Sequence, residues 1–140
     1  NFFLIRYKIV ETDSSGFLQF TDLPGYGFAE VSQAEQEKWR RMINRYLEQR
    51  NQLRALIVLV DIRHPADSKD VMLLEMLRVR RIEYSIVATK ADKIPKTKID
   101  KTVKDLAKGL GLQEEPIFPV SALNNTGMEP LYNWIQDKLS

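Results

Sequence analysis

The hydrophobic pattern begins with two runs that are typical of β-strands. Phe2–Val10 and Phe17–Thr21 are rich in aromatic and β-branched residues, and the polar residues 11–16 separate them. A cluster of turn-forming residues between two such runs is typical of a β-hairpin. The sequence therefore predicts two antiparallel strands at the start of the chain.

An amphipathic helix is predicted next. Apolar residues recur at helical spacing from Trp39 to Leu47, with polar residues between them. Ser32 and Glu35 have the spacing of a capping box, in which a hydroxyl and a carboxylate satisfy free backbone amides at a helix start. We therefore expect a helix that begins just after Ser32 and ends near Arg50.

Three later runs predict strands of a buried sheet. Ala55–Val60 contains no polar residue, which is typical of a parallel strand covered on both faces by helices. Ser85–Ala88 and Ile117–Val120 are shorter, and the proline within the last run favours a position at the sheet edge. Together the three runs predict a largely parallel sheet.

Helical stretches separate and follow these runs. One begins near Asp67, and another carries apolar residues from Ile99 to Leu110 and stops at Gly111. Gly111 suits the left-handed conformation in which many helices end. Thr126–Glu129 has capping-box spacing and predicts the start of a last helix.

This order of elements indicates an α/β fold with a doubly wound, mostly parallel sheet and an N-terminal antiparallel hairpin. In such sheets ligands bind at the carboxyl ends of the strands. Asp22, Asp61, Thr89 and Ser121 all fall at predicted strand ends. These positions are therefore the first candidates for a binding site.

The first candidate loop is Asp22-Leu23-Pro24-Gly25. A carboxylate after a strand can hold Mg²⁺, usually through water, and a glycine leaves its backbone amide free to approach a terminal phosphate. Asp22 and Gly25 are the candidates for these two roles on the phosphate side of a nucleotide. A strand-ending aspartate before Pro-Gly is also an everyday turn, so this loop alone does not decide between the two interpretations.

The second candidate loop, Thr89-Lys90-Ala91-Asp92, is more specific. The Asp92 carboxylate can accept hydrogen bonds from N1 and N2 of guanine, which adenine cannot donate in that arrangement. The Lys90 stem is expected to lie over the base plane, as long cationic side chains do on aromatic rings. The alternative is a solvated loop.

Ser121-Ala122 follows the last predicted strand and completes the set. A backbone amide there would pair with guanine O6, the acceptor that complements the donors bound by Asp92. The dipeptide alone has little specificity. Its weight comes from the order of the loops at successive strand ends, which supply a metal ligand, a base acceptor and a base donor as a GTP site requires. GTP or GDP and Mg²⁺ are therefore the expected cofactors.

Composition narrows the possibilities. With 44% hydrophobic and 29% charged residues, the 140 residues are ordinary for a globular protein. The lack of cysteine excludes disulfides and thiolate metal sites and favours a reducing compartment, the cytoplasm or an organelle matrix. The longest apolar stretch is too short to cross a bilayer, so no membrane partner is expected. A net charge of +2 permits nucleic-acid binding without establishing it.

The chain resembles the EngB group of GTPases, also called YihA or YsxC, along its whole length. The residues that carry the resemblance include Asp22-Leu23-Pro24-Gly25-Tyr26-Gly27-Phe28-Ala29, Asp61-Ile62-Arg63-His64-Pro65 and Thr89-Lys90-Ala91-Asp92-Lys93. The resemblance implies a GTPase that binds guanine nucleotide, assists assembly of the large ribosomal subunit through its ribosomal RNA, and is linked to normal cell division and septation. We expect a monomer.

Two features depart from complete GTPases. The phosphate loop G-x-x-x-x-G-K-[ST] is absent from the 140 residues, and in the family it lies upstream of the region that matches Asn1. Residues 1–140 are therefore expected to be the rear part of a GTPase domain, inactive alone, whose sheet either has a gap between Phe17–Thr21 and Ala55–Val60 or pairs them directly. Tyr26 stands where Ras-type GTPases carry a water-orienting glutamine, which implies slow intrinsic hydrolysis in the complete protein.

Two alternatives stay open. One is a truncated or degenerate GTPase fragment that binds RNA or protein without nucleotide, and the other is an ATP-binding protein of the same fold, against which Asp92 argues. Eight arginines are candidate contacts to ribosomal RNA, although charged residues spread over helix exteriors are usually solvated faces. They are Arg40, Arg41, Arg45, Arg50, Arg54, Arg78, Arg80 and Arg81.

Overall fold

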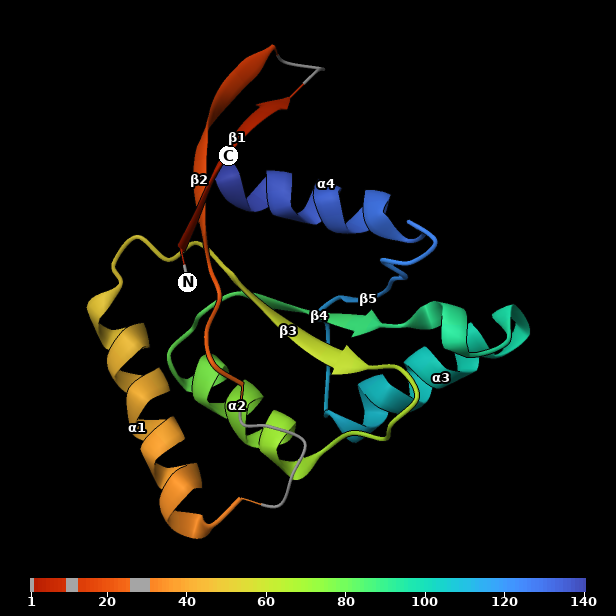
Figure 1. Cartoon of the computed structure of the whole chain (residues 1–140), viewed down its shortest axis with the longest axis horizontal. Coiled ribbons are helices and arrows are strands. Elements are labelled where there is room, and N and C mark those ends of the chain that lie inside the picture. Colours follow the sequence, from red (N-terminus) through yellow and green to blue (C-terminus); the bar gives the residue numbers. More distant parts are fainter. Residues whose placement is uncertain (1, 10–12, 26–30) are drawn as a thin grey trace. The chain divides into compact units, whose positions relative to one another are not determined.

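The computed structural model describes residues 2–9, 13–25 and 31–140. The chain forms two compact units, Asn1–Asn51 and Gln52–Ser140. Figure 1 colours the chain along its sequence, so that the first unit runs from red to orange and the second from yellow to blue. Each unit has its own β-sheet.

The first unit opens with a β-hairpin. β1 (Phe2–Ile9) and β2 (Ser14–Thr21) pair antiparallel, with Phe2 opposite Thr21. The predicted hairpin is therefore confirmed. β2 begins earlier than its apolar run because backbone pairing continues through polar residues beside the turn. Val10, predicted to end the first strand, lies outside the described residues.

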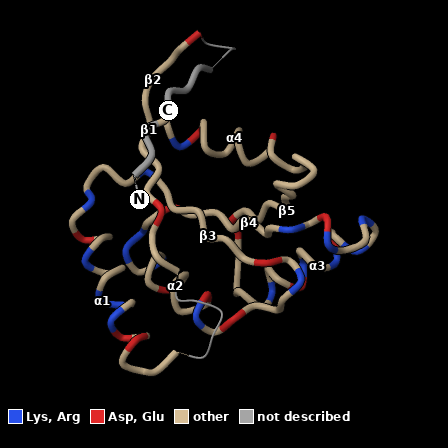
Figure 2. Tube along the Cα trace, viewed as in Figure 1, with Lys and Arg blue, Asp and Glu red and all other residues tan. Residues whose placement is uncertain are grey.

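Helix α1 (Gln33–Gln49) follows in the same unit and starts with the predicted capping box. Ser32 Oγ accepts a hydrogen bond from Glu35 N at 3.2 Å, and Ser32 N donates to Glu35 Oε2 at 3.1 Å. The two bonds satisfy backbone donors that the first helical turn leaves free. Basic and acidic residues are interspersed along the helix (Figure 2), whereas Ile43 and Leu47 are buried, so α1 is amphipathic as predicted.

A parallel sheet with the strand order β3-β4-β5 forms the centre of the second unit. Its strands are β3 (Leu56–Asp61), β4 (Tyr84–Thr89) and β5 (Ile117–Pro119). The helices are α2 (Ser68–Val79), α3 (Lys96–Gly109), α4 (Met128–Leu139) and the short 3-10 helix η1 (Ala91–Lys93). Figure 1 shows α2 and α3 on one face of this sheet and α4 on the other. The unit is therefore an α/β doubly wound structure with β5 at the edge, as predicted.

Each face of this sheet is covered by apolar side chains. On the α4 face, Val87 and Val120 form a buried cluster with Leu131. Ile86 precedes Val87 along β4, so it points to the opposite face, and it is fully buried there. The leucines of the helical segments that are also fully buried are Leu74, Leu77 and Leu110.

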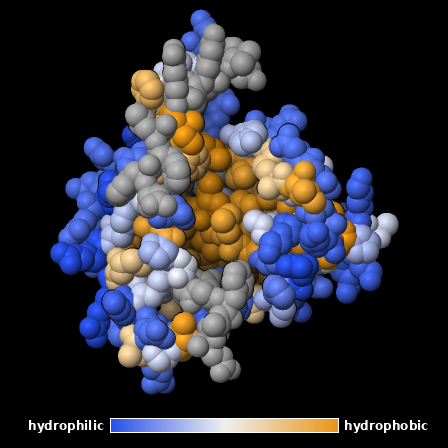
Figure 3. Space-filling view, in the orientation of Figure 1, coloured by the Kyte–Doolittle hydropathy of each residue, from blue (hydrophilic) through white to orange (hydrophobic). Residues whose placement is uncertain are grey.

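β3 differs from the prediction at one position. Its apolar run predicts a strand covered on both faces, yet Leu59 is 65% exposed. Val58 and Val60, which point to the opposite face, are buried. Among the described residues, the cluster on the α4 face reaches only as far along β3 as Ile57. Figure 3 shows hydrophobic side chains gathered over the strands and hydrophilic ones along the outer surfaces of the helices.

The described strands form two sheets rather than one. Within the second unit β3 is hydrogen-bonded to β4 alone, and a strand edge of this kind can accept a further strand. No helix in the described ranges is long and apolar enough to span a membrane.

Two helix ends depend on glycine. Gly111 has φ +66° and follows the end of α3, as predicted. The capping box predicted at Thr126 is wrong, because α4 begins after Gly127, which has φ +75° and provides no side-chain cap. Thr126 instead pairs its backbone amide and carbonyl with those of Ser121.

A polar network joins β4 to the segment before β5. Glu115 Oε1 accepts hydrogen bonds from Tyr84 OH at 2.6 Å and from Arg78 Nε at 3.0 Å, and Oε2 accepts from Gln113 N at 2.8 Å. Burial by itself raises the pKa of Glu115, but these hydrogen bonds outweigh it and lower the pKa to about 2. Burial, together with the bond to Glu115, raises the pKa of Tyr84 to about 12.

We expect the Glu115 carboxylate to stabilise the fold at neutral pH and to lose this contribution in acid. Because its pKa falls from 4.5 to about 2 on folding, the stabilisation is complete above pH 4.5 and disappears as the pH decreases towards 2. Glu115→Gln should lower the free energy of unfolding by about 1–2 kcal/mol at neutral pH.

Urea unfolding of both proteins across this pH range measures the effect. The difference in unfolding free energy between wild type and Glu115→Gln should narrow as the pH falls, because the wild-type carboxyl then also becomes neutral. A difference that stays constant down to pH 2 would contradict the assignment.

Candidate functional site

The carboxyl ends of β3, β4 and β5 lie side by side and are joined by hydrogen bonds. Asp61 pairs in register with Thr89, so β3 and β4 end at the same level of the sheet. Ile62 N donates to Thr89 O at 3.0 Å, and Thr89 Oγ1 donates to Val60 O at 3.1 Å. The loops that follow β3 and β4 are therefore held together by both backbone and side chain.

A further backbone bond holds the loop after β4 to the end of β5. Ala91 N donates to Val120 O at 3.0 Å, and Val120 N donates to Ala88 O at 2.9 Å. These bonds extend the pairing of β4 and β5 past the last strand residue. The segment Thr89–Asp92 is thereby fixed between its two neighbours, which gives a rigid base for the side chains it carries.

Asp92 and Ser121 meet in this rigid region. Ser121 Oγ donates to Asp92 Oδ1 at 2.7 Å, and the Asp92 side chain is only 8% exposed. This hydrogen bond is the main cause that holds the pKa of Asp92 below its ordinary value, so the carboxylate is ionised at neutral pH. Lys93 Nζ lies 3.8 Å from Asp92 Oδ2, beyond ordinary hydrogen-bond distance. The second oxygen of Asp92 therefore keeps acceptor capacity.

Lys90 adopts a conformation that non-glycine residues rarely take. Its φ and ψ are 61° and 36°, in the left-handed region, and the 3-10 turn η1 starts directly after it. Lys93 N donates to Lys90 O at 2.9 Å and closes this turn. The Lys90 side chain is 52% exposed, and its Nζ lies 3.0 Å from Asp61 Oδ2.

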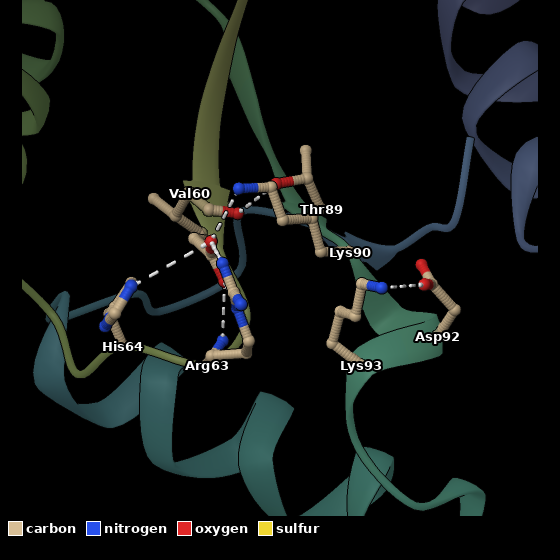
Figure 4. A network of polar contacts seen from close by, with 8 residues as sticks. Val60, Arg63, His64, Thr89, Lys90, Asp92 and Lys93 are labelled. Carbon is tan, nitrogen blue, oxygen red and sulfur yellow. Dashed lines mark hydrogen bonds and ion pairs between the residues drawn. The ribbon is translucent and has the colours of Figure 1, made fainter. Parts of the chain in front are cut away.

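Asp61 is a buried carboxylate with two cationic partners, Arg63 and Lys90. Figure 4 shows the side chains of Arg63, His64 and Lys90 in this network of polar contacts. Its side chain is 5% exposed and accepts hydrogen bonds from Arg63 Nε at 3.0 Å and Arg63 Nη2 at 2.7 Å. The bond from the Arg63 side chain is the largest influence on the pKa of Asp61 and, with Lys90, holds it far below the ordinary value, although burial opposes this. His64 Nε2 lies 3.9 Å from the same carboxylate, so the chain's one histidine is part of this loop.

The structure distinguishes the two backbone amides of the Ser121-Ala122 pair. The Ser121 amide donates to Thr126 O at 3.0 Å, so this amide is already occupied. Ser121 is fully buried, and its hydroxyl also accepts a bond from Asn124 N at 3.1 Å. The sequence left two backbone amides, those of Ser121 and Ala122, as candidate donors to guanine O6. For the Ala122 amide, no described residue supplies a backbone carbonyl as acceptor.

The residues Asp22–Gly25 belong to the first unit. Asp22 comes directly after β2, as predicted, and is exposed. Trp39 Nε1 of α1 donates to Pro24 O at 2.7 Å, which ties this loop to the helix. Tyr26 and the rest of the 26–30 segment lie outside the described residues.

No group of three or more His, Cys, Asp or Glu side chains within the described ranges gathers in a way that could hold a metal ion. A Mg²⁺ ion bound with a nucleotide does not need such a group, because phosphate oxygens and water fill most of its ligand positions. A single exposed carboxylate such as Asp22 is therefore compatible with Mg²⁺ held through water.

Sequence reasoning missed two contributions to the site. It assigned Ser121 only a backbone role, whereas the serine hydroxyl binds Asp92. It noted Asp61 as a strand end but did not connect it with Arg63 or Lys90. One signal was present for Asp61, because a charged residue that closes an entirely apolar strand needs a partner when it is buried.

A parallel sheet with helices on both faces and polar loops at the carboxyl ends of its strands defines an α/β protein of the doubly wound class. Comparison with known proteins gives the family. A probable GTP-binding protein EngB from Streptococcus pneumoniae (strain ATCC 700669 / Spain 23F-1) is 43% identical over 123 residues, which cover 87% of this chain and 63% of that protein. Its counterpart in Desulforapulum autotrophicum is 36% identical over 140 residues, covering 100% and 68%. The chain belongs to the EngB family.

Other comparisons agree in fold and extent. A probable GTP-binding protein EngB from Ligilactobacillus salivarius is 42% identical over 120 residues, or 85% of this chain and 61% of the relative. The chain therefore spans less than two thirds of the length of several curated relatives that it matches. The crystal structure of a probable GTP-binding protein engB has a similar fold, with a TM-score of 0.70, 21% identity, and coverage of 86% of this chain and 75% of that one. No protein-family model matches the chain.

We expect Gly127 to be essential for the segment that carries Ser121. A Cβ at Gly127 would lie 2.1 Å from Pro119 O, and the φ of +75° disfavours any side chain. Gly127→Ala should therefore destabilise the protein by about 3 kcal/mol or more. Gly111→Ala is the matched control, because its φ is +66° but nothing lies within 4 Å of the added Cβ, and it should cost only about 1–2 kcal/mol.

Urea unfolding of the two variants separates backbone strain from steric overlap. Equal losses of unfolding free energy in the two alanine variants would mean that the close approach to Pro119 has no energetic weight.

Proposed function

We propose that this chain is the guanine-binding part of an EngB-type GTPase. The observation that carries the proposal is the Asp92 carboxylate, which is ionised, only 8% exposed and held through one oxygen by Ser121. A carboxylate has about four positions for hydrogen-bond donors. Asp92 can therefore accept the Ser121 hydroxyl and, in addition, the N1 and N2 donors of guanine.

Base selectivity follows from the cost of leaving these groups unpaired. Adenine presents an acceptor where guanine presents N1–H, so an adenine nucleotide would leave the Asp92 carboxylate without a donor. Sites that hydrogen-bond a ligand group reject analogues lacking it by large factors. The backbone amide of Ala122 is the proposed donor to guanine O6, and the Lys90 stem is the proposed contact to the base plane.

On the phosphate side we propose Asp22 as a ligand of Mg²⁺ through water. We propose the backbone amides of Leu23 and Gly25 as donors near the terminal phosphate, because Pro24 between them has no N–H. When bound, Mg²⁺ supplies neutralisation of the charge that develops on the phosphoryl oxygens. The tie between Trp39 and Pro24 supports this assignment, because it restrains the loop on which Asp22 stands. Hydrolysis of GTP is proposed for the complete protein, to which 1–140 contribute the rear part of the GTPase domain.

The proposed cellular role is assistance in assembling the large ribosomal subunit, in the cytoplasm or an organelle matrix, by a monomer whose loss disturbs cell division and septation. The basic residues of α1 support an RNA partner. Arg41 is 78% exposed and lies 3.4 Å from Glu37, and Arg40 lies 3.7 Å from the same carboxylate. Exposed ion pairs of this kind are weak, so both guanidinium groups can exchange Glu37 for a phosphate.

The guanine assignment predicts a change of base preference. In the full-length protein, Asp92→Asn should weaken GDP binding by about 100-fold and strengthen XDP binding relative to GDP, because xanthine carries an acceptor where guanine carries the N2 donors. Titration of the wild type and the variant with fluorescent GDP and XDP measures both affinities.

Glu115→Gln is the matched control, since it also neutralises a buried carboxylate but lies outside the proposed site, and its nucleotide affinities should equal those of the wild type. Unchanged GDP affinity in Asp92→Asn would refute the guanine pocket. Preference of the wild type for ADP would favour the ATP-binding alternative, and binding of RNA with no nucleotide affinity would favour the nucleotide-independent one.

The ribosomal assignment predicts binding that depends on the nucleotide. The full-length protein should cosediment with large ribosomal subunits more tightly with a non-hydrolysable GTP analogue than with GDP. Changing Arg40 and Arg41 together to Glu should weaken this binding and reduce the slope of log affinity against log salt by up to about 2, because two phosphate contacts are lost.

The control is the change of Lys101 and Lys104 on α3 to Glu, which should weaken cosedimentation with the large subunit less than the change of Arg40 and Arg41 does. Equal cosedimentation with GTP analogue and GDP, or equal effects of the two charge reversals, would count against the proposed interface on α1.

A further inference from the structure

The Asp61 carboxylate is shared between two loops of the second unit. Oδ1 accepts from Arg63 N and Nε, both at 3.0 Å, while Oδ2 lies 2.7 Å from Arg63 Nη2 and 3.0 Å from Lys90 Nζ. Arg63 belongs to the same loop as Asp61, whereas Lys90 comes from the loop after β4. These four contacts fill the acceptor positions of the carboxylate. Asp61 therefore fixes the end of the Lys90 side chain in one place.

The backbone does not need this contact to hold its shape. The loop that carries Lys90 is already fixed by the hydrogen bonds from Ile62 N to Thr89 O, from Thr89 Oγ1 to Val60 O and from Ala91 N to Val120 O. Asp61 likewise has three bonds from Arg63 within its own loop. The ion pair between Asp61 and Lys90 is thus an addition whose main effect is on the direction of the Lys90 side chain.

A lysine side chain that is free in solvent samples many rotamers, and ordering them on ligand binding lowers affinity. Lys90 is 52% exposed along its length, but its Nζ is tethered to a carboxylate that is 5% exposed. The stem of this half-exposed side chain is therefore held in a restricted conformation between the backbone and the tethered ammonium group. A preformed apolar surface of this kind is suited to contact the plane of a base.

We propose that Asp61 is a positioning residue for nucleotide binding, which holds Lys90 by its ammonium group so that the lysine stem forms a ready-made contact surface for the guanine base. Arg63 keeps the carboxylate in the one orientation that reaches Lys90. The inference rests on the proposed function, since it requires that the loop of Lys90 and Asp92 binds guanine.

The test is a double-mutant cycle on the full-length protein with fluorescent GDP as the ligand. Asp61→Asn keeps the shape of the side chain and removes its charge, and Lys90→Met keeps an unbranched stem and removes the ammonium. Each single variant should weaken GDP binding by about 3–10-fold, and the double variant should be no weaker than Lys90→Met alone, because Asp61 acts through Lys90.

A spectroscopic measurement distinguishes positioning from a general structural effect. In the nucleotide-free protein, the Lys90 ammonium should give a motion-restricted ¹⁵N NMR signal, assigned by its disappearance in Lys90→Met. The signal should become mobile in Asp61→Asn while thermal unfolding still shows a folded protein. If Asp61→Asn does not fold, Asp61→Glu takes its place in the cycle, since it keeps the charge but moves the carboxylate by one methylene.

The outcomes separate this inference from the function on which it rests. If the wild type binds GDP and Asp92→Asn shifts its preference to XDP, but Asp61→Asn binds GDP as tightly as the wild type or its effect adds to that of Lys90→Met, the positioning role is wrong and the proposed function stands. If the wild type binds no GDP, both are wrong.

Discussion

The second unit depends on the parallel register of β3, β4 and β5. Because parallel strands end at the same edge of a sheet, this register brings three polar loops together, and Asp61 lies directly opposite Thr89. The backbone amides and carbonyls beyond the strands then bond across the loops instead of facing water, as between Ala91 and Val120. The rigidity of the candidate site is thus a continuation of the sheet.

Two carboxylates in this region are stabilised in different ways, and the difference accounts for their different proposed roles. Asp61 is saturated by Arg63 and Lys90, and such a group can orient its partners but has no capacity left for a ligand. Asp92 is stabilised mainly by one neutral hydroxyl, that of Ser121. An ionised carboxylate with a vacant acceptor position attracts hydrogen-bond donors, which is the property that a guanine pocket requires.

Membership of the EngB family rests on sequence identities of 36% to 43% to its relatives over most of the chain. The observed fold, in which polar loops follow the strand ends, agrees with this assignment. The two units divide the candidate site residues between them, with Asp22–Gly25 in the first and the candidate guanine contacts in the second. Several of these relatives are longer than this chain, which covers 63% and 61% of two of them.

Sequence by itself determined the hairpin, the helices, the parallel strands and the loops at their ends, because hydrophobic periodicity and turn residues are local signals. The capping box at Ser32 and the left-handed Gly111 belong to this group. Tertiary structure alone decided which distant side chains meet, as with Ser121 and Asp92. The tertiary structure also brings the backbone of residue 127 so close to Pro119 O that only glycine fits there. Gly127, and not Thr126, is therefore the residue that precedes α4. Such pairings depend on packing between segments remote in sequence, which no local pattern encodes.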